Sequence, residues 1–378
     1  MSGTPYCCPE SGGPTPKGLR VDGWVIVAAA VAALTVELVA FWVVDGRMLP
    51  AASRASTVLL DLGIALAGAI PWLAFEPLVA PGASGLLYLP VAVLGAVAAF
   101  IATIAVRAAG AHPVSSLVFA FVWSALVFAP AAIVSFTRIG VLEFIGISPI
   151  DHGGSLAANV ASGAAALAVL LVSRGTRRRL ADIPFGLSIT AVVTLCLAWL
   201  GWLVWAELAV DAATPAILLN GLVGTGGGML GWLFIQRIRH QATTVTGVGA
   251  GLISGLIAIA AGAPLFTPVS AAAGGIIAGA IGALVAFAAV RRTRRPQWTV
   301  VGTHLVAGGL GVIGLGFSAE GLGMFYDGQI DLATSQILAT ILIAGYSMLV
   351  AVLLWFGAVR PWISSRAGAR PSAPRPRG

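Results

Sequence analysis

Positively charged residues in this chain gather in every second connection between long apolar stretches. About eleven stretches are long and apolar enough to cross a ~30 Å hydrocarbon core as α-helices. They lie near residues 24–44, 58–79, 85–106, 114–136, 156–173, 184–208, 214–235, 245–262, 268–290, 299–317 and 335–358. The pattern predicts an all-α polytopic membrane protein.

The charges in the connections also predict the orientation of the chain. Arginine fills the odd-numbered connections and the tail, at Arg47, Arg54, Arg107, Arg174, Arg177, Arg178, Arg179, Arg237, Arg239, Arg291, Arg292, Arg294, Arg295, Arg360, Arg366, Arg370, Arg375 and Arg377. The even-numbered connections carry mainly acids, with Arg138 as the main exception. Because basic connections stay in the cytoplasm, we predict an outside N-terminus and an inside C-terminus.

Composition supports the same class of protein. Charged residues make up 9% of the chain, hydrophobic residues 58%, and the mean hydropathy is +0.98, which excludes a soluble domain. The net charge of +7 comes largely from arginines in short connections, so we expect a lipid bilayer as the surroundings and no nucleic-acid partner. We predict a multi-pass protein of the plasma membrane.

The chain divides into one membrane domain and two short ends. We expect residues 1–21 to form a disordered extracellular leader, 22–360 the membrane domain, and 361–378 a disordered basic cytoplasmic tail. The apolar stretches also divide into two sets of five plus a final helix. Because five is odd, two such sets insert with opposite orientation, so we predict two inverted five-helix repeats.

Ionisable residues inside apolar stretches are candidates for function because burying them is costly. The candidates are Asp61, Glu37, Glu207 and His304. The structural alternatives are a solvated helix end for Asp61, hydrogen bonds within the bundle for the two glutamates, and a satisfied core imidazole for His304. No paired-histidine spacing, Ser/Lys dyad or phosphate-binding loop accompanies His304, so we expect neither an enzyme nor a cofactor.

Several sequence blocks resemble the ammonium transporter (Amt/Mep/Rh) family. The blocks, in chain order, are FVWSALVFAP at 121–130, DHGGS at 151–155, WLGWLVW at 199–205, the glycine-rich run 246–268, and GTHLVAGG at 302–309. They are similar to the family's fourth and fifth spans, its sixth span, and its eighth to tenth spans. Their order and spacing extend the resemblance over about residues 22–360.

The resemblance implies a homotrimer in which each subunit has its own narrow, hydrophobic pore. In the family, aromatic residues and a hydroxyl collect ammonium at an outer site, a phenylalanine gate follows, and two hydrogen-bonded histidines lie in mid-membrane. An ammonium ion loses its water in such a pore only where other polar groups replace it. Cation–π contacts ease its passage inward, and imidazoles relay its proton.

Carried over to this chain, the resemblance places Asp151 below the recruitment site and His304 at the second pore histidine. Phe136 takes the place of the outer-site tryptophan, and Trp205 that of the inner gate phenylalanine. Asp151 is equally suited to cap the N-terminus of the fifth span, and both roles are compatible. We therefore expect Asp151 to orient the backbone and to favour a nearby cation.

Other positions depart from the family pattern. Counting onward from Asp151 without a gap replaces the first pore histidine by Asn159, whereas alignment on the Gly-Gly pair replaces it by Ala158. We prefer Asn159, because a deletion rotates the following residues by ~100° on a helix. The outer hydroxyl becomes Ala209, and the first gate phenylalanine falls near Val91. Asparagine does not titrate, which argues against a relay through two histidines.

Two further departures lie near the C-terminal half. The acidic residues before the second histidine are replaced by Arg295, Pro296 and Gln297. The family's charged C-terminal regulatory segment has no counterpart, so we do not expect a regulatory partner of the PII type.

Two functions remain in view. The first is transport of ammonium or ammonia across the plasma membrane through a pore with a single-histidine waist. The second is a divergent member of the same fold that senses ammonium without conducting it, or that passes only a neutral gas. The loss of one histidine, of the hydroxyl and of the first gate favours the second function, whereas the short tail offers no signalling domain.

The arginine pattern generates a direct test of orientation. A reporter fused after Arg360 is expected to read cytoplasmic, and one inserted in 320–331 external, because basic connections remain inside. Paired alkaline phosphatase and fluorescent protein fusions measure both positions. The opposite readings would exclude the predicted topology.

Overall fold

The described part of the chain is helical throughout. The computed structural model describes residues 23–45, 54–79, 85–137, 141–173, 185–240 and 242–363. Helices and the turns between them account for these residues, and no strand occurs among them. The predicted leader (1–21) and the tail beyond Ile363 lie outside the described residues, as do the side chain of Glu37 and the arginines at 174–179. The all-α prediction is confirmed.

Each predicted apolar stretch coincides with a helical segment. The segments are α1 (Gly23–Asp45), α2 (Arg54–Val79), α3 (Gly85–Ala108), α4 (Pro113–Trp123) with η2 (Ser124–Phe128) and α5 (Ala129–Phe136), η3 (Ser155–Val160) with α7 (Ala161–Val172), α8 (Phe185–Ala206), α9 (Thr214–Ile238), α10 (Val245–Ala260), α11 (Pro268–Thr293), α12 (Trp298–Val300) with η5 (Val301–Val306) and α13 (Ala307–Ser318), and α15 (Asp331–Leu354) with η6 (Trp355–Val359). Three short helices, α6 (Val141–Phe144), η4 (Ala263–Leu265) and α14 (Met324–Asp327), lie in connections.

Length and composition qualify most of these segments as membrane spans. Within the described residues, nine helices are long and apolar enough to cross a bilayer, and two shorter apolar helices cover Val27–Ala40 and Val245–Ala260. The polytopic membrane class is therefore confirmed. The count of about eleven crossings, the inverted repeats and the orientation stay predictions.

The helices begin where the sequence supplies caps. Thr244 Oγ1 accepts a hydrogen bond from the Gly247 N–H at the start of α10, and Thr267 Oγ1 accepts one from the Ser270 N–H at the start of α11. Pro268 follows Thr267 at the first helical position, where a missing N–H costs nothing. These caps satisfy backbone donors that a helix end leaves without partners.

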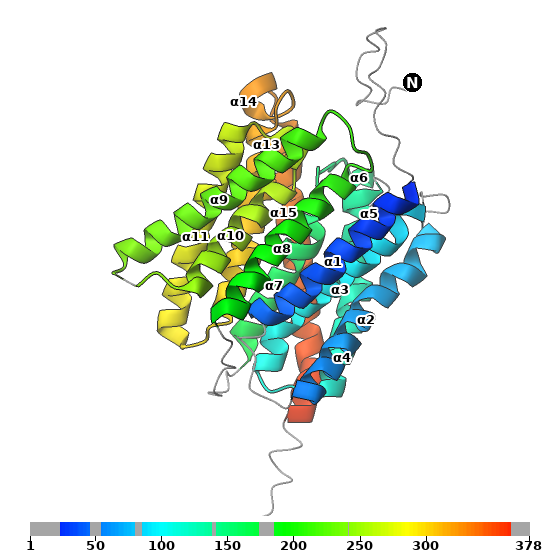
Figure 1. Ribbon diagram of the computed structural model, residues 1–378. Coiled ribbons are helices and arrows are strands. Elements are labelled where there is room, and N and C mark those ends of the chain that lie inside the picture. Colours follow the sequence, from blue (N-terminus) through cyan, green and yellow to red (C-terminus); the bar gives the residue numbers. More distant parts are fainter. Residues whose placement is uncertain are drawn as a thin grey trace, which may run out of the picture.

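The long helices lie side by side in one bundle (Figure 1). Helices α9, α10 and α11 pack against one another, α2 packs against α3, and α1 packs against both α3 and α8. Helix α7 contacts α3, α15 and η5. This packing brings η3 and η5, which are far apart in the chain, into the centre of the fold.

Small residues allow the closest helix contacts. Gly255 on α10 faces Gly228 on α9, and a Cβ atom added to Gly255 would lie only 2.9 Å from the Gly228 backbone nitrogen. Helices surrounded by lipid gain little from burying apolar surface against each other, so close van der Waals contact supplies much of the attraction. The glycine content of the spans therefore follows from dense packing.

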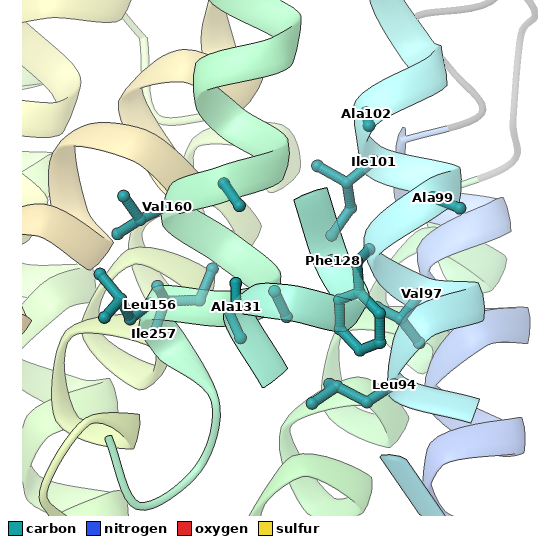
Figure 2. Close-up of a cluster of buried hydrophobic side chains, with 14 of the residues drawn as sticks. Leu94, Val97, Ala99, Ile101, Ala102, Phe128, Ala131, Leu156, Val160 and Ile257 are labelled. Carbon is teal, nitrogen blue, oxygen red and sulfur yellow. The ribbon is translucent and has the colours of Figure 1, made fainter. Parts of the chain in front are cut away.

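Most of the buried side chains in the described residues are hydrophobic and form one large cluster. Figure 2 shows Phe128 of η2 against Leu94 and Val97 of α3, with Leu156 and Val160 of η3 on the other side of the cluster. All of these side chains are buried. Any polar group in this interior therefore needs a partner within the protein.

One such partnership joins α2 to α3. An Arg107 Nη1 atom lies 2.6 Å from Asp61 Oδ1, and the two side chains are only 7% and 12% exposed. The Arg107 guanidinium also lies 5.7 Å from the centroid of the Phe100 ring. The solvated helix end considered for Asp61 is wrong, because Arg107 near the end of α3 covers and neutralises the carboxylate.

We expect Arg107→Leu to lower the free energy of unfolding by about 3–5 kcal/mol, because the variant leaves a charged Asp61 buried without its counter-ion. Asp61→Asn combined with Arg107→Leu removes both charges and is expected to recover much of the loss. Thermal unfolding of the detergent-solubilised proteins measures the difference. Equal stability of the two variants would show that the pair does not act as a unit.

Candidate functional site: a polar pair in the bundle and a turn above it

Two polar side chains meet in the centre of the bundle. His304 Nδ1 lies 2.9 Å from Asn159 Oδ1, although 145 positions separate the residues in the chain. Both side chains are completely buried. Of the two alignments considered from the sequence, the structure thus places Asn159, and not the methyl group of Ala158, in hydrogen-bond contact with His304.

The hydrogen bond defines the tautomer of the imidazole. An amide oxygen only accepts, so Nδ1 of His304 carries the hydrogen and donates it to Asn159. In the neutral ring Nε2 then holds a lone pair. The Nδ2 amino group of Asn159 is buried and makes no hydrogen bond to the described residues. The pair therefore presents both a donor and an acceptor.

Both residues of the pair lie in π-helical turns. Asn159 belongs to η3 and His304 to η5, each six residues long and continued by an α-helix. A π turn closes its hydrogen bond over five residues and interrupts the regular side-chain register, and such turns are frequent at functional sites. The sequence offers no pattern that predicts these two turns.

A glycine lets the two π-helical segments approach. Gly163 lies one turn after Asn159, and a Cβ atom there would lie 2.5 Å from the backbone nitrogen of Leu305, the residue that follows His304. Because any larger side chain would push η5 away from α7, Gly163 sets the distance over which Asn159 and His304 meet.

An arginine fixes the same two segments at their other end. Arg295, just before α12, donates from Nη1 to the carbonyl oxygens of Leu170 (2.8 Å) and Ser173 (3.1 Å), and from Nη2 to Ser173 Oγ (2.8 Å). These acceptors end α7, whose last carbonyls otherwise lack donors. Arg295, noted in the sequence only as a replacement for acidic residues, thus holds the segment of Asn159 against that of His304.

Asp151 begins the segment that carries Asn159. Its Oδ2 accepts hydrogen bonds from Ser135 Oγ (2.7 Å) and from the backbone N–H groups of Leu156 (2.9 Å) and Ala157 (3.2 Å). Burial raises the pKa of the Asp151 carboxyl to about 6, and the hydrogen bonds from Ser135 and the backbone oppose that rise. Asp151 therefore caps η3, and its Oδ1 is buried without a hydrogen bond to the described residues.

Other helices hold this connection, residues 150–154, which we call the Asp151 turn. The side-chain amide of Gln336 on α15 forms two hydrogen bonds with the backbone of Ile150 (3.1 and 2.9 Å). Trp202 Nε1 donates to the carbonyl oxygen of Gly153 (2.8 Å), while the N–H of Gly153 donates to Ala260 (2.7 Å). The turn is thus bonded to α8, α10 and α15 together.

Glycine is required within the turn. Gly154 has a positive φ of 74°, which favours glycine, and a Cβ atom there would lie 2.9 Å from Cζ of Phe136. The Gly-Gly pair of the sequence motif therefore serves a tight turn under an aromatic ring.

Aromatic rings cover one side of the turn. Phe136 meets Trp202 edge to face, with centroids 6.3 Å apart, and Trp202 stacks on Trp205 with centroids 4.6 Å apart. Sequence comparison proposed Phe136 and Trp205 and missed Trp202, which joins them. The run of tryptophans in 199–205 carried that signal, because residues three apart lie on one face of a helix.

The remaining proposed positions carry no polar group. Val91 is completely buried in α3, and Ala209 lies half-buried in the bend after α8. Their roles at the gate and at the outer site stay predictions.

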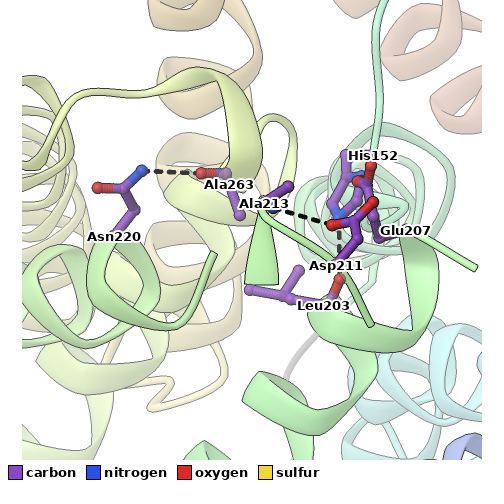
Figure 3. A network of polar contacts seen from close by, with 7 residues as sticks. All are labelled: His152, Leu203, Glu207, Asp211, Ala213, Asn220 and Ala263. Carbon is purple, nitrogen blue, oxygen red and sulfur yellow. Dashed lines mark hydrogen bonds and ion pairs between the residues drawn. The ribbon is translucent and has the colours of Figure 1, made fainter. Parts of the chain in front are cut away.

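A second polar cluster lies beside the Asp151 turn (Figure 3). His152 Nε2 donates to the carbonyl oxygen of Leu203 (2.9 Å), and its Nδ1 lies 3.7 Å from Oε2 of Glu207. Asp211 follows, accepting the N–H of Ala213 (2.8 Å). Glu207 was selected from the sequence as an intramembrane acid, but it lies in the bend that ends α8 and is part of this cluster.

The fold and these contacts define a multi-pass α-helical membrane protein with a buried polar pair. A model of the Ammonium Transporter Family matches residues 57–360, which is most of the chain. The chain belongs to the Ammonium Transporter Family.

Curated relatives support the assignment. The chain is 27% identical over 266 residues to an ammonium transporter of Mycobacterium tuberculosis, an alignment that covers 63% of this chain and 54% of that protein. It is 27% identical over 238 residues to an ammonium transporter of Bacillus subtilis, covering 59% of this chain and 57% of that protein. The chain thus spans little more than half the length of these relatives.

Solved structures share the fold. Saccharomyces cerevisiae Mep2 superposes with a TM-score of 0.75 at 15% identity, covering 89% of this chain and 86% of Mep2. A structure named Sensor Amt Protein superposes with a TM-score of 0.75 at 16% identity, covering 88% of this chain and 92% of its own. At these identities the likeness describes the fold.

We expect Asp151→Ala to destabilise the protein strongly, because it leaves Ser135 Oγ and two backbone N–H groups without their acceptor, at ~1–3 kcal/mol for each buried group. Asp151→Asn keeps an acceptor and is the matched variant. Thermal unfolding in detergent measures both. An Asp151→Ala protein as stable as the wild type would remove Asp151 from its capping role.

The same residue predicts a pH dependence. Because the folded-state pKa of about 6 lies above the ordinary 3.8, the folded protein binds the proton more tightly than the unfolded chain. The stability of the wild type relative to Asp151→Asn is therefore greatest below the ordinary pKa of 3.8. It decreases as the pH rises through the folded-state pKa of about 6. A difference that stays constant between about pH 4 and pH 7 would contradict the burial of this charge.

Proposed function

We propose that this chain moves ammonium or ammonia across the plasma membrane through a narrow pore whose waist is the Asn159–His304 pair. The observation that carries the proposal is the buried hydrogen bond between them, in a chain that belongs to the Ammonium Transporter Family. Burying polar groups among apolar side chains costs free energy even when they are hydrogen-bonded to each other, so such a pair inside a membrane bundle is a candidate for function.

The chemistry of the pair favours the neutral molecule at the waist. Ammonia has one lone pair and accepts a hydrogen bond, and Asn159 Nδ2 is a buried donor with no partner among the described residues. Ammonium has no lone pair, so it cannot accept a hydrogen bond from Asn159 Nδ2. Asparagine also takes up no proton near neutral pH, which leaves His304 as the one titratable group of the pair.

The outer part of the pathway uses the remaining proposed residues. Phe136, which is only partly buried, offers an aromatic ring to a cation, the buried Trp202–Trp205 stack lies beside it, and the carboxylate of Asp151 adds negative charge behind them. Trp205 and Val91 form the gate in this proposal, and Ala209 lines the outer site without the usual hydroxyl. A cation thus exchanges water for ring faces and a nearby carboxylate before it gives up its proton.

A channel for neutral gas alone is the second candidate, and Asn159 is the observation that favours it. The sensor alternative has less support, since the likeness to Sensor Amt Protein at 16% identity concerns the fold. Assembly as a homotrimer follows from the family resemblance and stays part of the proposal. A PII-type regulatory partner is not proposed.

Reconstitution tests the proposed function. In liposomes, an ammonium jump is expected to change the internal pH through ammonia flux while producing little or no current, because the waist has one titratable group. Stopped-flow fluorescence and solid-supported-membrane currents record the two quantities. A recording with no current, and with no pH change beyond that of protein-free liposomes, would contradict transport.

Asn159→His is the corresponding gain-of-function variant. It restores a second titratable group beside His304, so we expect a larger ammonium-driven current than in the wild type. Asn159→Ala is the matched control, because it removes the amide without adding an imidazole. A large wild-type current that Asn159→His leaves unchanged would exclude Asn159 from the waist.

A further inference from the structure

His152 is an imidazole that the proposed pathway does not use. Its Nε2 donates to the carbonyl oxygen of Leu203, so in the neutral ring Nδ1 holds the lone pair. That nitrogen faces Glu207 Oε2 at 3.7 Å. Leu203 lies in the last turn of α8, where backbone carbonyls lack helical donors and where a positive charge is favoured. Both nitrogens of the ring therefore face negative groups.

The position of His152 connects two parts of the outer site. Its backbone N–H donates to the carbonyl oxygen of Ala261 (2.8 Å), which anchors the residue in the Asp151 turn. Its ring contacts the end of α8, whose Trp202 and Trp205 form the aromatic stack. A change at the His152 ring therefore acts on both elements.

We propose that His152 and Glu207 form a proton-operated brace, which ties the end of α8 to the Asp151 turn and sets the pH dependence of cation capture. The inference rests on the proposed function and assigns a positioning and regulatory role to these two residues. Protonation of Nδ1 converts a contact between a lone pair and a carboxylate into an ion pair, in which Nδ1–H donates a hydrogen bond once the two atoms approach from 3.7 Å to hydrogen-bond distance.

The charges around the brace determine its response. Glu207 and, behind it, Asp211 are the carboxylates on the α8 side, and Asp151 is the adjacent residue in the turn. Helix α10 brings no titratable side chain, and α8 brings only Cys196. The carboxylates and the end of α8 favour the imidazolium, whereas burial lowers the pKa of His152 and raises that of Glu207.

The sign of the effect follows from these charges. At neutral pH His152 is uncharged and the carboxylates give the outer site a negative potential that attracts cations. On acidification His152 takes up a proton and neutralises Glu207. The midpoint lies on the acidic side of the ordinary imidazole range, because burial lowers the pKa of His152. Cation capture is therefore expected to weaken as pH falls through that midpoint.

Nitrogen NMR of the protein labelled with ¹⁵N-histidine tests the brace without any transport. The chain has four histidines, and His152→Gln identifies the signals of His152. We expect the Nε2–H tautomer for His152 and the Nδ1–H tautomer for His304 at alkaline pH. Glu207→Gln is expected to lower the His152 midpoint, because it removes a negative neighbour. An Nδ1–H tautomer, or an unchanged midpoint, would overturn the brace.

Transport in liposomes between about pH 5 and pH 8 tests its consequence. In the wild type we expect ammonium uptake to decrease as the pH falls through the His152 midpoint. This decrease is expected to disappear in His152→Gln and to move to lower pH in Glu207→Gln. His112→Asn is the matched control, because His112 caps α4 instead and its variant is expected to keep the wild-type profile. Glu207→Gln also covers the case in which His152→Gln does not fold, since Glu207 is the more exposed partner.

The outcomes separate the brace from other causes. A loss of uptake that is the same in the wild type and both brace variants belongs to another group, such as Asp151, and overturns the regulatory role. A wild-type protein that moves neither ammonium nor ammonia contradicts the proposed function and this regulatory role with it. The NMR titration still decides, in that case, whether the His152–Glu207 brace exists.

Discussion

The cost of placing polar groups in an apolar interior governs this structure. The helices satisfy the backbone polar groups, because each helix forms its hydrogen bonds within itself where no water is present. Some buried hydroxyls also bond within their own helix, as Thr225, Ser254 and Thr340 donate to a carbonyl one turn back, whereas other buried polar side chains of the described residues pair across helices. Arg107 neutralises Asp61, Ser347 accepts a hydrogen bond from Trp123 (3.0 Å), and Asn159 accepts one from His304. These pairs specify which helix faces meet, a selection that apolar contact alone leaves open.

The hydrogen bonds of the Asp151 turn fix the position of the segment that carries Asn159. It bonds to α8, α10 and α15, and Asp151 itself caps the π-helical segment that carries Asn159. Arg295 holds the other end of the same segment. The position of Asn159 relative to His304 is therefore determined from both ends, as the proposed role of this pair in a pore requires.

The departures from the family pattern concern charge more than shape. In the alignment predicted from the sequence, asparagine at 159 stands in place of a titratable group and still bonds to His304, and alanine at 209 stands in place of a hydroxyl. In the same region His152 and Glu207 place two titratable groups between α8 and the Asp151 turn. In the proposed pathway, one imidazole thus lies in the centre of the bundle, at His304, and a second lies in the Asp151 turn, at His152.

The sequence by itself determined the helical membrane class and the position of nearly every long helix, because apolar length and charge depend only on local composition. It also contained the family resemblance and a preference for Asn159 over Ala158. Only the tertiary structure decided that Asn159 contacts His304 through two π-helical turns, that Arg107 covers Asp61, and that His152 meets Glu207. These features depend on helix register and on residues distant in the chain, and local composition carries no information about either.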